Sequence, residues 1–64
     1  MNAALQQAID LLGSQAALAR RIGIRPQAVQ QWTAAGRVPP DRCLAVEHAT
    51  EGKVSRYELR PDVF

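Results

Sequence analysis

The chain has 64 residues, carries eight Lys or Arg against six Asp or Glu, and is 47% apolar. A chain of this size buries only about 60% of the surface that its unfolded form exposes, so we expect marginal stability. The composition excludes a disordered chain, and a membrane helix is excluded because no apolar run approaches the roughly 20 residues that it needs.

The first residues and the cysteine content indicate the cellular compartment and limit the kinds of site that the chain can form. Asn2-Ala3-Ala4 follows Met1 without the basic and apolar pattern of a signal peptide, so we expect a cytoplasmic protein. One cysteine, Cys43, cannot form a disulfide framework or a zinc site by itself. The sequence shows no internal repeat or linker and therefore predicts a single domain over residues 1–64.

Charge is distributed unevenly along the chain. Residues 15–42 hold five arginines and one aspartate, whereas the remaining residues are net negative. A basic middle between neutral or acidic ends is typical of a domain that meets a polyanion with one face. The alternative is a solvated helix surface, and charge alone does not separate the two.

Apolar periodicity predicts a first helix over residues 3–12. Leu5 and Ile9 lie one helical turn apart, Asn2 is suited to the N-cap, and Gly13 is suited to the end.

A second helix is predicted over residues 15–22. Ser14 is suited to its N-cap, its inward side holds Leu18 and Ile22, and Gly23 ends it.

A third helix is predicted over about residues 26–34. The fixed φ of Pro26 suits the first helical position, and Val29 and Trp32 share the inward face. This leaves three amide side chains pointing outward, namely Gln27, Gln30 and Gln31.

The remaining residues predict a fourth helix and one further turn. Pro40 and Asp41 suit the first turn of a helix over about residues 40–50. Its inward stripe holds Cys43, Val46 and Ala49. Ser55 could cap a last turn through Leu59. We therefore expect an all-α fold of four to five helices, although residues 54–64 are too few for periodicity to separate helix from strand.

Residues 15–34 match the pattern of a helix-turn-helix. A small Ala19 lets the third helix cross close to the second, and Gly23 supplies the tight turn. The apolar side chains that would fix the crossing angle are Leu18, Ile22, Ile24, Val29 and Trp32.

These segments resemble a known class of proteins. Gln15-Ala16-Ala17-Leu18-Ala19-Arg20-Arg21-Ile22-Gly23 and Gln27-Ala28-Val29-Gln30-Gln31-Trp32 resemble the phage Cro and repressor class. Gly36-Arg37-Val38-Pro39-Pro40-Asp41-Arg42-Cys43-Leu44-Ala45-Val46-Glu47 and Glu58-Leu59-Arg60-Pro61-Asp62-Val63-Phe64 resemble the narrower YdaS-like Cro group. The resemblance covers about residues 4–64. It implies a compact lambda-repressor-like fold and DNA binding, usually as a dimer, at an operator.

The outward amides have a specific chemistry in that setting. A carboxamide pairs with the N7 and N6 groups of adenine, so a glutamine on a helix in the major groove can contact that base bidentately. The N-terminal residues of a recognition helix face the bases. We therefore expect base contacts from Pro26, Gln27, Gln30 and Gln31, with Gln30 nearer the backbone or the flanking base pair. Exposed glutamines are also ordinary helix formers, and only the surrounding apolar pattern favours the base-contacting role.

Four further residues are candidate phosphate contacts. Gln15 would offer its amide and the start of its helix to a phosphate. Arg25 lies where related proteins often carry a Ser or Thr cap, and it could bind a phosphate or reach a guanine. Arg37 lies in the turn after the third helix, and Arg42 follows it. Arg20 and Arg21 could lie on the far side.

No catalytic or metal site is expected. Cys43 is best interpreted as a buried small apolar residue and His48 as a solvated side chain without partners. No nucleophile, base and orienting group can be assembled, and no Gly-rich phosphate loop is present. We expect neither an enzyme nor a cofactor.

Two functions remain from different classes. The first is a sequence-specific repressor of the Cro type on double-stranded DNA, and the second is an antitoxin-type interaction module that masks a partner toxin. A homodimer through the C-terminal third is expected in the first case, because one recognition helix contacts few base pairs. The apolar residues assigned to that contact are Leu44, Val54, Tyr57, Leu59, Val63 and Phe64.

Overall fold

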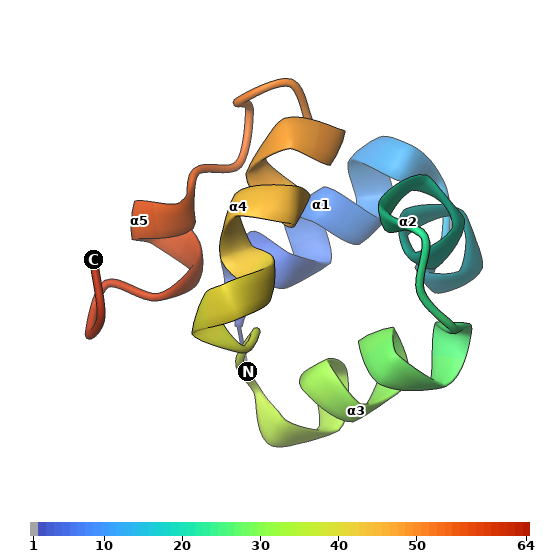
Figure 1. Cartoon of the computed structure of the whole chain (residues 1–64), viewed down its shortest axis with the longest axis horizontal. Coiled ribbons are helices and arrows are strands. Elements are labelled where there is room, and N and C mark those ends of the chain that lie inside the picture. Colours follow the sequence, from blue (N-terminus) through green and yellow to red (C-terminus); the bar gives the residue numbers. More distant parts are fainter. Residues whose placement is uncertain (1) are drawn as a thin grey trace.

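The computed structural model describes residues 2–64, which form five α-helices and no strand (Figure 1). The helices are α1 (Ala3–Leu12), α2 (Gln15–Ile22), α3 (Pro26–Ala35), α4 (Pro40–Ala49) and α5 (Arg56–Leu59). The expected all-α fold is confirmed. The first four helices begin at the predicted residues, and only the ends of α3 and α4 differ, by one residue each. No helix within residues 2–64 has the length and apolarity needed to cross a membrane.

Side-chain caps explain where three of the helices begin. The Asn2 side chain accepts a hydrogen bond from the Leu5 amide at 3.1 Å, and the Ser14 hydroxyl accepts one from the Ala17 amide at 3.0 Å. Ser55 caps α5 in the same way. Each cap satisfies an amide that has no partner inside its helix. These starts are therefore fixed by residues next to them in the sequence.

The start of α3 lacks such a cap. Arg25 takes the extended N-cap conformation, but its side chain makes no capping hydrogen bond, and Pro26 occupies the first helical position. Proline suits that position because its φ is already helical and it has no amide to satisfy. At the other end Gly36 has a φ of 77°, which a glycine adopts without strain, and its amide donates to the Trp32 carbonyl at 2.8 Å.

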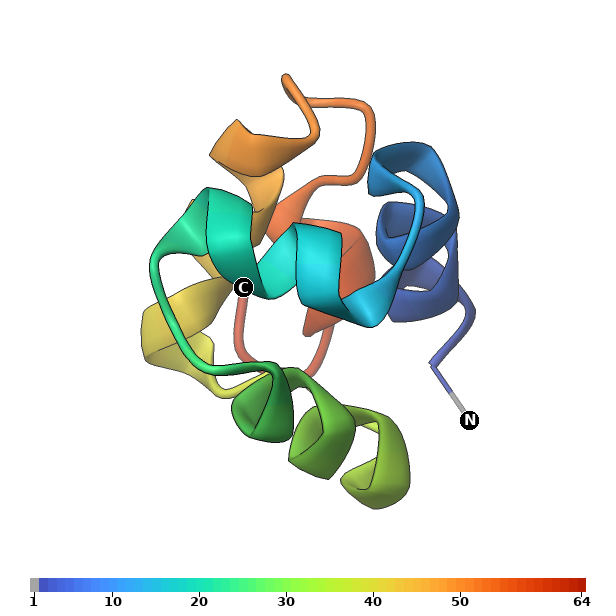
Figure 2. The ribbon, with the colours of Figure 1, turned by 90° about the vertical axis from the view of Figure 1, so that its right-hand side faces the viewer.

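One continuous core joins the helices. Leu18 and Ala19 of α2 and Val29 of α3 are fully buried, and Trp32 is 7% exposed. α2 packs against α1, α3 and α4, while Ile22 and Ile24 pack at the margin of the core. The apolar side chains that were predicted to fix the crossing of α2 and α3 are therefore in the core or at its margin. In both Figure 1 and Figure 2, α3 lies along the lower edge of the molecule, with the other helices above it.

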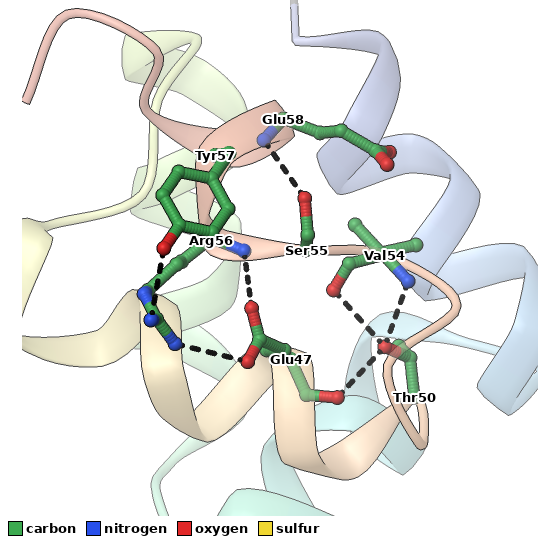
Figure 3. A network of polar contacts seen from close by, with 7 residues as sticks. All are labelled: Glu47, Thr50, Val54, Ser55, Arg56, Tyr57 and Glu58. Atoms are coloured by element: carbon green, nitrogen blue, oxygen red, sulfur yellow. Dashed lines mark hydrogen bonds and ion pairs between the residues drawn. The ribbon is translucent and has the colours of Figure 1, made fainter. Parts of the chain in front are cut away.

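The chain after α4 contributes more to the core than the sequence indicated. Val54 and Leu59, which were expected on an exposed apolar surface, are 0% and 1% exposed. The Thr50 hydroxyl accepts the Val54 amide at 3.1 Å and so holds this loop against the end of α4 (Figure 3). The side chain of Asn2 donates to the Leu59 carbonyl at 3.1 Å. Both contacts tie the backbone of this segment to the rest of the fold, and the expectation that the two side chains are exposed was wrong.

A polar network then fastens α5 to α4. One carboxylate oxygen of Glu47 accepts the Arg56 amide at 2.8 Å, and the other accepts the Arg56 guanidinium at 3.1 Å (Figure 3). The guanidinium also donates to the Tyr57 hydroxyl at 3.1 Å and lies 4.9 Å from the centre of that ring. A helix of four residues has little intrinsic stability, so these contacts determine where α5 lies.

Candidate nucleic-acid interface

The outward face of α3 carries three glutamines. Gln27 and Gln31 lie one helical turn apart, Gln30 lies beside them, and all three are exposed. The inward face is formed by Val29 and Trp32. Because an α-helix repeats every 3.6 residues, burial of those two side chains directs the amides away from the core. The expectation that they point outward is confirmed.

The side-chain amides of these glutamines form no hydrogen bond within residues 2–64. Within residues 2–64, the one side-chain hydrogen bond formed by α3 joins the Thr33 hydroxyl to the Val29 carbonyl of the same helix, at 3.0 Å. Each glutamine therefore keeps its full set of donors and acceptors for another molecule.

Positive side chains lie at both ends of α3. Arg25 is exposed at the N-cap, next to exposed Pro26. Arg37 is exposed in the turn that follows α3, where its amide donates to the Trp32 carbonyl at 3.1 Å. α3 thus presents a row of amides between two guanidinium groups, an arrangement that fits polar base edges between two phosphates.

The other two candidate phosphate contacts lie on neighbouring helices. Gln15 is the first residue of α2 and is half-buried, and Arg42 is exposed in the first turn of α4. The start of α4 follows the end of α3 after a short turn, so Arg42 is close to Arg37 along the chain. Arg42 therefore comes soon after the end of α3, whereas Gln15 is at the start of α2.

Arg20 and Arg21 lie in a different place from the α3 face. Both line a shallow hollow with Leu12 at the end of α1, and Arg21 lines a second hollow with His48 and Ala49 at the end of α4. In Figure 1 these helix ends are on the side of the molecule away from α3. His48 is exposed, as expected.

One residue near the interface was missed by the sequence reasoning. Arg60, after α5, donates to the Val38 carbonyl at 3.0 Å and makes two hydrogen bonds to Asp62, at 2.9 and 2.8 Å. Those bonds lower the pKa of Asp62 to about 2, and the charge of nearby Arg37 acts in the same direction. The spacing of Arg60 and Asp62 around Pro61 could have indicated the ion pair, but its contact with Val38, 22 residues away, has no local signal.

Two further expectations concern the thiol of Cys43 and the side chains that could bind a metal ion. Cys43 is buried, and desolvation raises the pKa of its thiol, so the reactive thiolate is disfavoured. Within residues 2–64, no group of three His, Cys, Asp or Glu side chains is placed to hold a metal ion. The α3 face therefore presents exposed hydrogen-bonding and cationic groups, which suit binding.

Comparison with known proteins agrees with this arrangement. Residues 5–64 match the family described as "Bacterial toxin YdaS". The chain is 44% identical over 63 residues to the "Putative transcriptional regulator YdaS" of Escherichia coli (strain K12). That match covers 97% of this chain and 64% of the relative, so the chain spans less than two thirds of the relative's length.

A solved structure gives the same fold. The protein described as "Structure of the Cro protein from putative prophage element Xfaso 1 in Xylella fastidiosa strain Ann-1" is 52% identical and superposes with a TM-score of 0.93, covering 100% of this chain and 97% of the other. α2, the turn at Gly23 and α3 are therefore the helix-turn-helix of a Cro-like fold. Because the family match extends over residues 5–64, the chain belongs to the YdaS family.

Proposed function

We propose that this chain is a DNA-binding transcriptional regulator that places α3 in the major groove of a specific double-stranded operator. The observation that carries the proposal is the face of α3, where three exposed amides with no hydrogen-bond partner among residues 2–64 lie opposite the buried Val29 and Trp32. The names of the relatives, a transcriptional regulator and a Cro protein, support the same function.

The residues divide into two roles in this proposal. Gln27 and Gln31 contact base edges, with Pro26 and Gln30 beside them. Arg25, Arg37, Arg42 and Gln15 contact phosphates, since most protein–DNA hydrogen bonds go to the backbone. Arg25 also remains a candidate for a guanine contact, because an arginine pairs bidentately with the O6 and N7 of guanine.

The test is a selection of bound fragments from random duplexes, followed by binding measurements on the selected sequence. We expect Gln27→Ala and Gln31→Ala each to reduce discrimination at particular base pairs by about 1–3 kcal/mol. Gln7→Ala is the matched control, because Gln7 is an exposed glutamine of α1, and it should leave discrimination unchanged. A wild-type protein that enriches no sequence would remove this proposal.

The phosphate role has a separate signature. Arg37→Ala should weaken binding to all duplexes alike and lower the slope of log affinity against log salt by about one unit. Arg21→Ala is the control with the same charge change, because Arg21 lines hollows with residues of α1 and α4. Equal salt slopes for the two variants would assign the effect to net charge alone.

We further propose that the regulator binds as a homodimer through its C-terminal third. Four large apolar side chains remain exposed there after Val54 and Leu59 are assigned to the core: Leu44, Tyr57, Val63 and Phe64. The rings of Tyr57 and Phe64 pack edge to face with centroids 6.4 Å apart. A dimer would present two α3 helices to half-sites about 34 Å apart.

Sedimentation with and without the selected duplex tests the dimer. Val63→Asp adds a charge to the exposed apolar residues and should convert cooperative binding into binding by independent monomers. Leu11→Asp is the control, because Leu11 is exposed to a similar extent on α1. A wild-type protein that remains a monomer on DNA would contradict this part of the proposal.

The family description favours a second function in the class of protein interaction. The sequence also allows an antitoxin that masks a toxin, whereas the matched family is described as a toxin. An antitoxin acts by binding its toxin, so that role requires a protein partner. Co-purification of a partner by the Gln31→Ala variant as efficiently as by the wild type would show that such an interaction is independent of the α3 face.

A further inference from the structure

Arg60 ties the C-terminal residues to the turn that follows α3. Its guanidinium donates from Nη1 to the carbonyl of Val38 at 3.0 Å, and the side chain is only 12% exposed. Val38 is fully buried and lies in the turn between α3 and α4. The contact joins two positions 22 residues apart. It is therefore a tertiary link between the end of the chain and the edge of the candidate interface.

Asp62 holds the Arg60 guanidinium in the orientation that this link needs. Nε donates to one carboxylate oxygen at 2.9 Å and Nη2 to the other at 2.8 Å. Such a bidentate pair restricts rotation of the guanidinium, because both bonds lie in its plane. The remaining nitrogen, Nη1, is thereby aimed at the Val38 carbonyl. We call Arg60, Asp62 and the Val38 carbonyl the C-terminal clamp.

The residue before Val38 is Arg37, the candidate phosphate contact. Its amide donates to the Trp32 carbonyl at 3.1 Å, while its side chain is exposed. Thus α3 holds the backbone on one side of Arg37, and the C-terminal clamp holds the carbonyl on the other side. The backbone that carries the Arg37 side chain is thus held at the Arg37 amide and at the Val38 carbonyl.

The other arginine of this region provides a contrast. Arg56 also forms an ion pair and backbone contacts, but its partners are Glu47 of α4 and Tyr57 of α5. Loss of Arg56 would therefore loosen α5 without removing a contact to the turn that carries Arg37.

We propose that Arg60 is a positioning residue for DNA binding, which acts by holding the Val38 carbonyl and so placing Arg37 against a phosphate. This inference rests on the proposed function. Arg60 itself does not touch the DNA in this account. A preorganised contact binds more tightly than one that must be ordered during association.

The first experiment is a double-mutant cycle on the duplex selected by the wild type. Arg60→Gln should weaken binding by about tenfold and lower the salt slope by about one unit, as loss of the Arg37 phosphate contact would. In the Arg37→Ala background the same substitution should have little further effect. Arg56→Gln is the control and should keep the wild-type salt slope in both backgrounds. Equal losses from Arg60→Gln with and without Arg37 would overturn the inference, since they would indicate a general loss of folded protein.

The second experiment needs no DNA. Hydrogen exchange of the Arg37 amide, measured by NMR on the whole chain, reports local opening of the turn. Arg60→Gln should accelerate this exchange by about tenfold relative to Arg56→Gln, and Arg60→Lys should give an intermediate rate because lysine cannot form the planar pair. Equal rates in the Gln variants would overturn the inference and leave the proposed function intact. Failure of the wild type to select any duplex would instead remove the proposed function, and with it the DNA role of Arg60.

Discussion

α3 and the C-terminal residues 56–64 use their polar side chains in opposite ways. α3 is held by the buried side chains of Val29 and Trp32, and its glutamines face solvent with no hydrogen-bond partner in the part of the chain that the structure describes. The C-terminal residues form a shorter helix, yet Arg56 and Arg60 both bond to the rest of the fold.

The difference shows that the way a segment is held in the fold decides how many of its polar groups remain free to bind another molecule. A helix that is attached by apolar burial keeps its polar groups available, because burial is non-directional and needs none of them. Residues 56–64 add directional hydrogen bonds to the burial of Leu59, and those bonds leave the segment few free polar groups.

The largest effect should come from removing the apolar attachment of α3. We expect Trp32→Ala to lower the free energy of unfolding by about 3–5 kcal/mol, which is a large share of the stability of a chain this small. Gln30→Ala, on the exposed side of the same helix, should change it by less than about 0.5 kcal/mol. Urea unfolding followed by far-UV circular dichroism measures both free energies. A Trp32 variant as stable as the Gln30 variant would contradict the attachment of α3 by apolar burial.

A smaller effect should follow from removing the polar attachment of α5. Glu47→Ala leaves the amide and guanidinium of Arg56 without their acceptor, and should lower the free energy of unfolding by about 1–3 kcal/mol. Glu47→Gln keeps an acceptor oxygen for the Arg56 amide and should lose less. The same urea titration compares them, and identical losses would show that the charge, rather than the hydrogen bond, holds α5.

The uncapped start of α3 allows a substitution that stabilises the fold. Arg25→Ser introduces a side chain that accepts an amide hydrogen, and the variant should be more stable than Arg25→Ala by about 0.5–2 kcal/mol. Both variants lose the same charge, so both should weaken binding to duplex DNA alike. Thermal unfolding and a binding titration test the pair, and equal stability of the two would mean that these amides gain nothing from a cap.

The smallest expected effect concerns acid. Hydrogen bonds from Arg60 lower the pKa of Asp62 from 3.8 to about 2. The ionised carboxylate therefore stabilises the fold above about pH 4, and this contribution is lost as the pH falls toward 2. Asp62→Asn should remove that part of the acid sensitivity, so its stability should fall less steeply between pH 5 and pH 2. Parallel curves for wild type and variant would show that Asp62 does not contribute.

Sequence reasoning succeeded where the determining contacts are local. Asn2, Ser14, Gly23 and Pro26 fix helix ends through neighbours within a few residues, and the predicted starts of α1 to α4 are confirmed. The outward placement of the α3 glutamines followed from the 3.6-residue period and the burial of Trp32. Their contact with bases remains a prediction.

The failures lie where distant residues meet. Leu59 was expected at the surface, but its carbonyl accepts a hydrogen bond from Asn2, 57 residues away. The bond from Arg60 to the Val38 carbonyl was missed for the same reason. Val54 is a different case, because its partner Thr50 is only four residues away, and the apolar pattern alone did not indicate that contact. Local patterns describe helices well, but they contain little information on how a short C-terminal segment folds back.

The freedom of the α3 amides has a consequence for how such proteins diversify. Since Gln27, Gln30 and Gln31 contribute no internal bond, each can be exchanged for another polar residue while Val29 and Trp32 keep the helix in place. Under the proposed function, one scaffold can thus support a large repertoire of target sequences, and a library randomised at these three positions would sample that repertoire while the core keeps the fold.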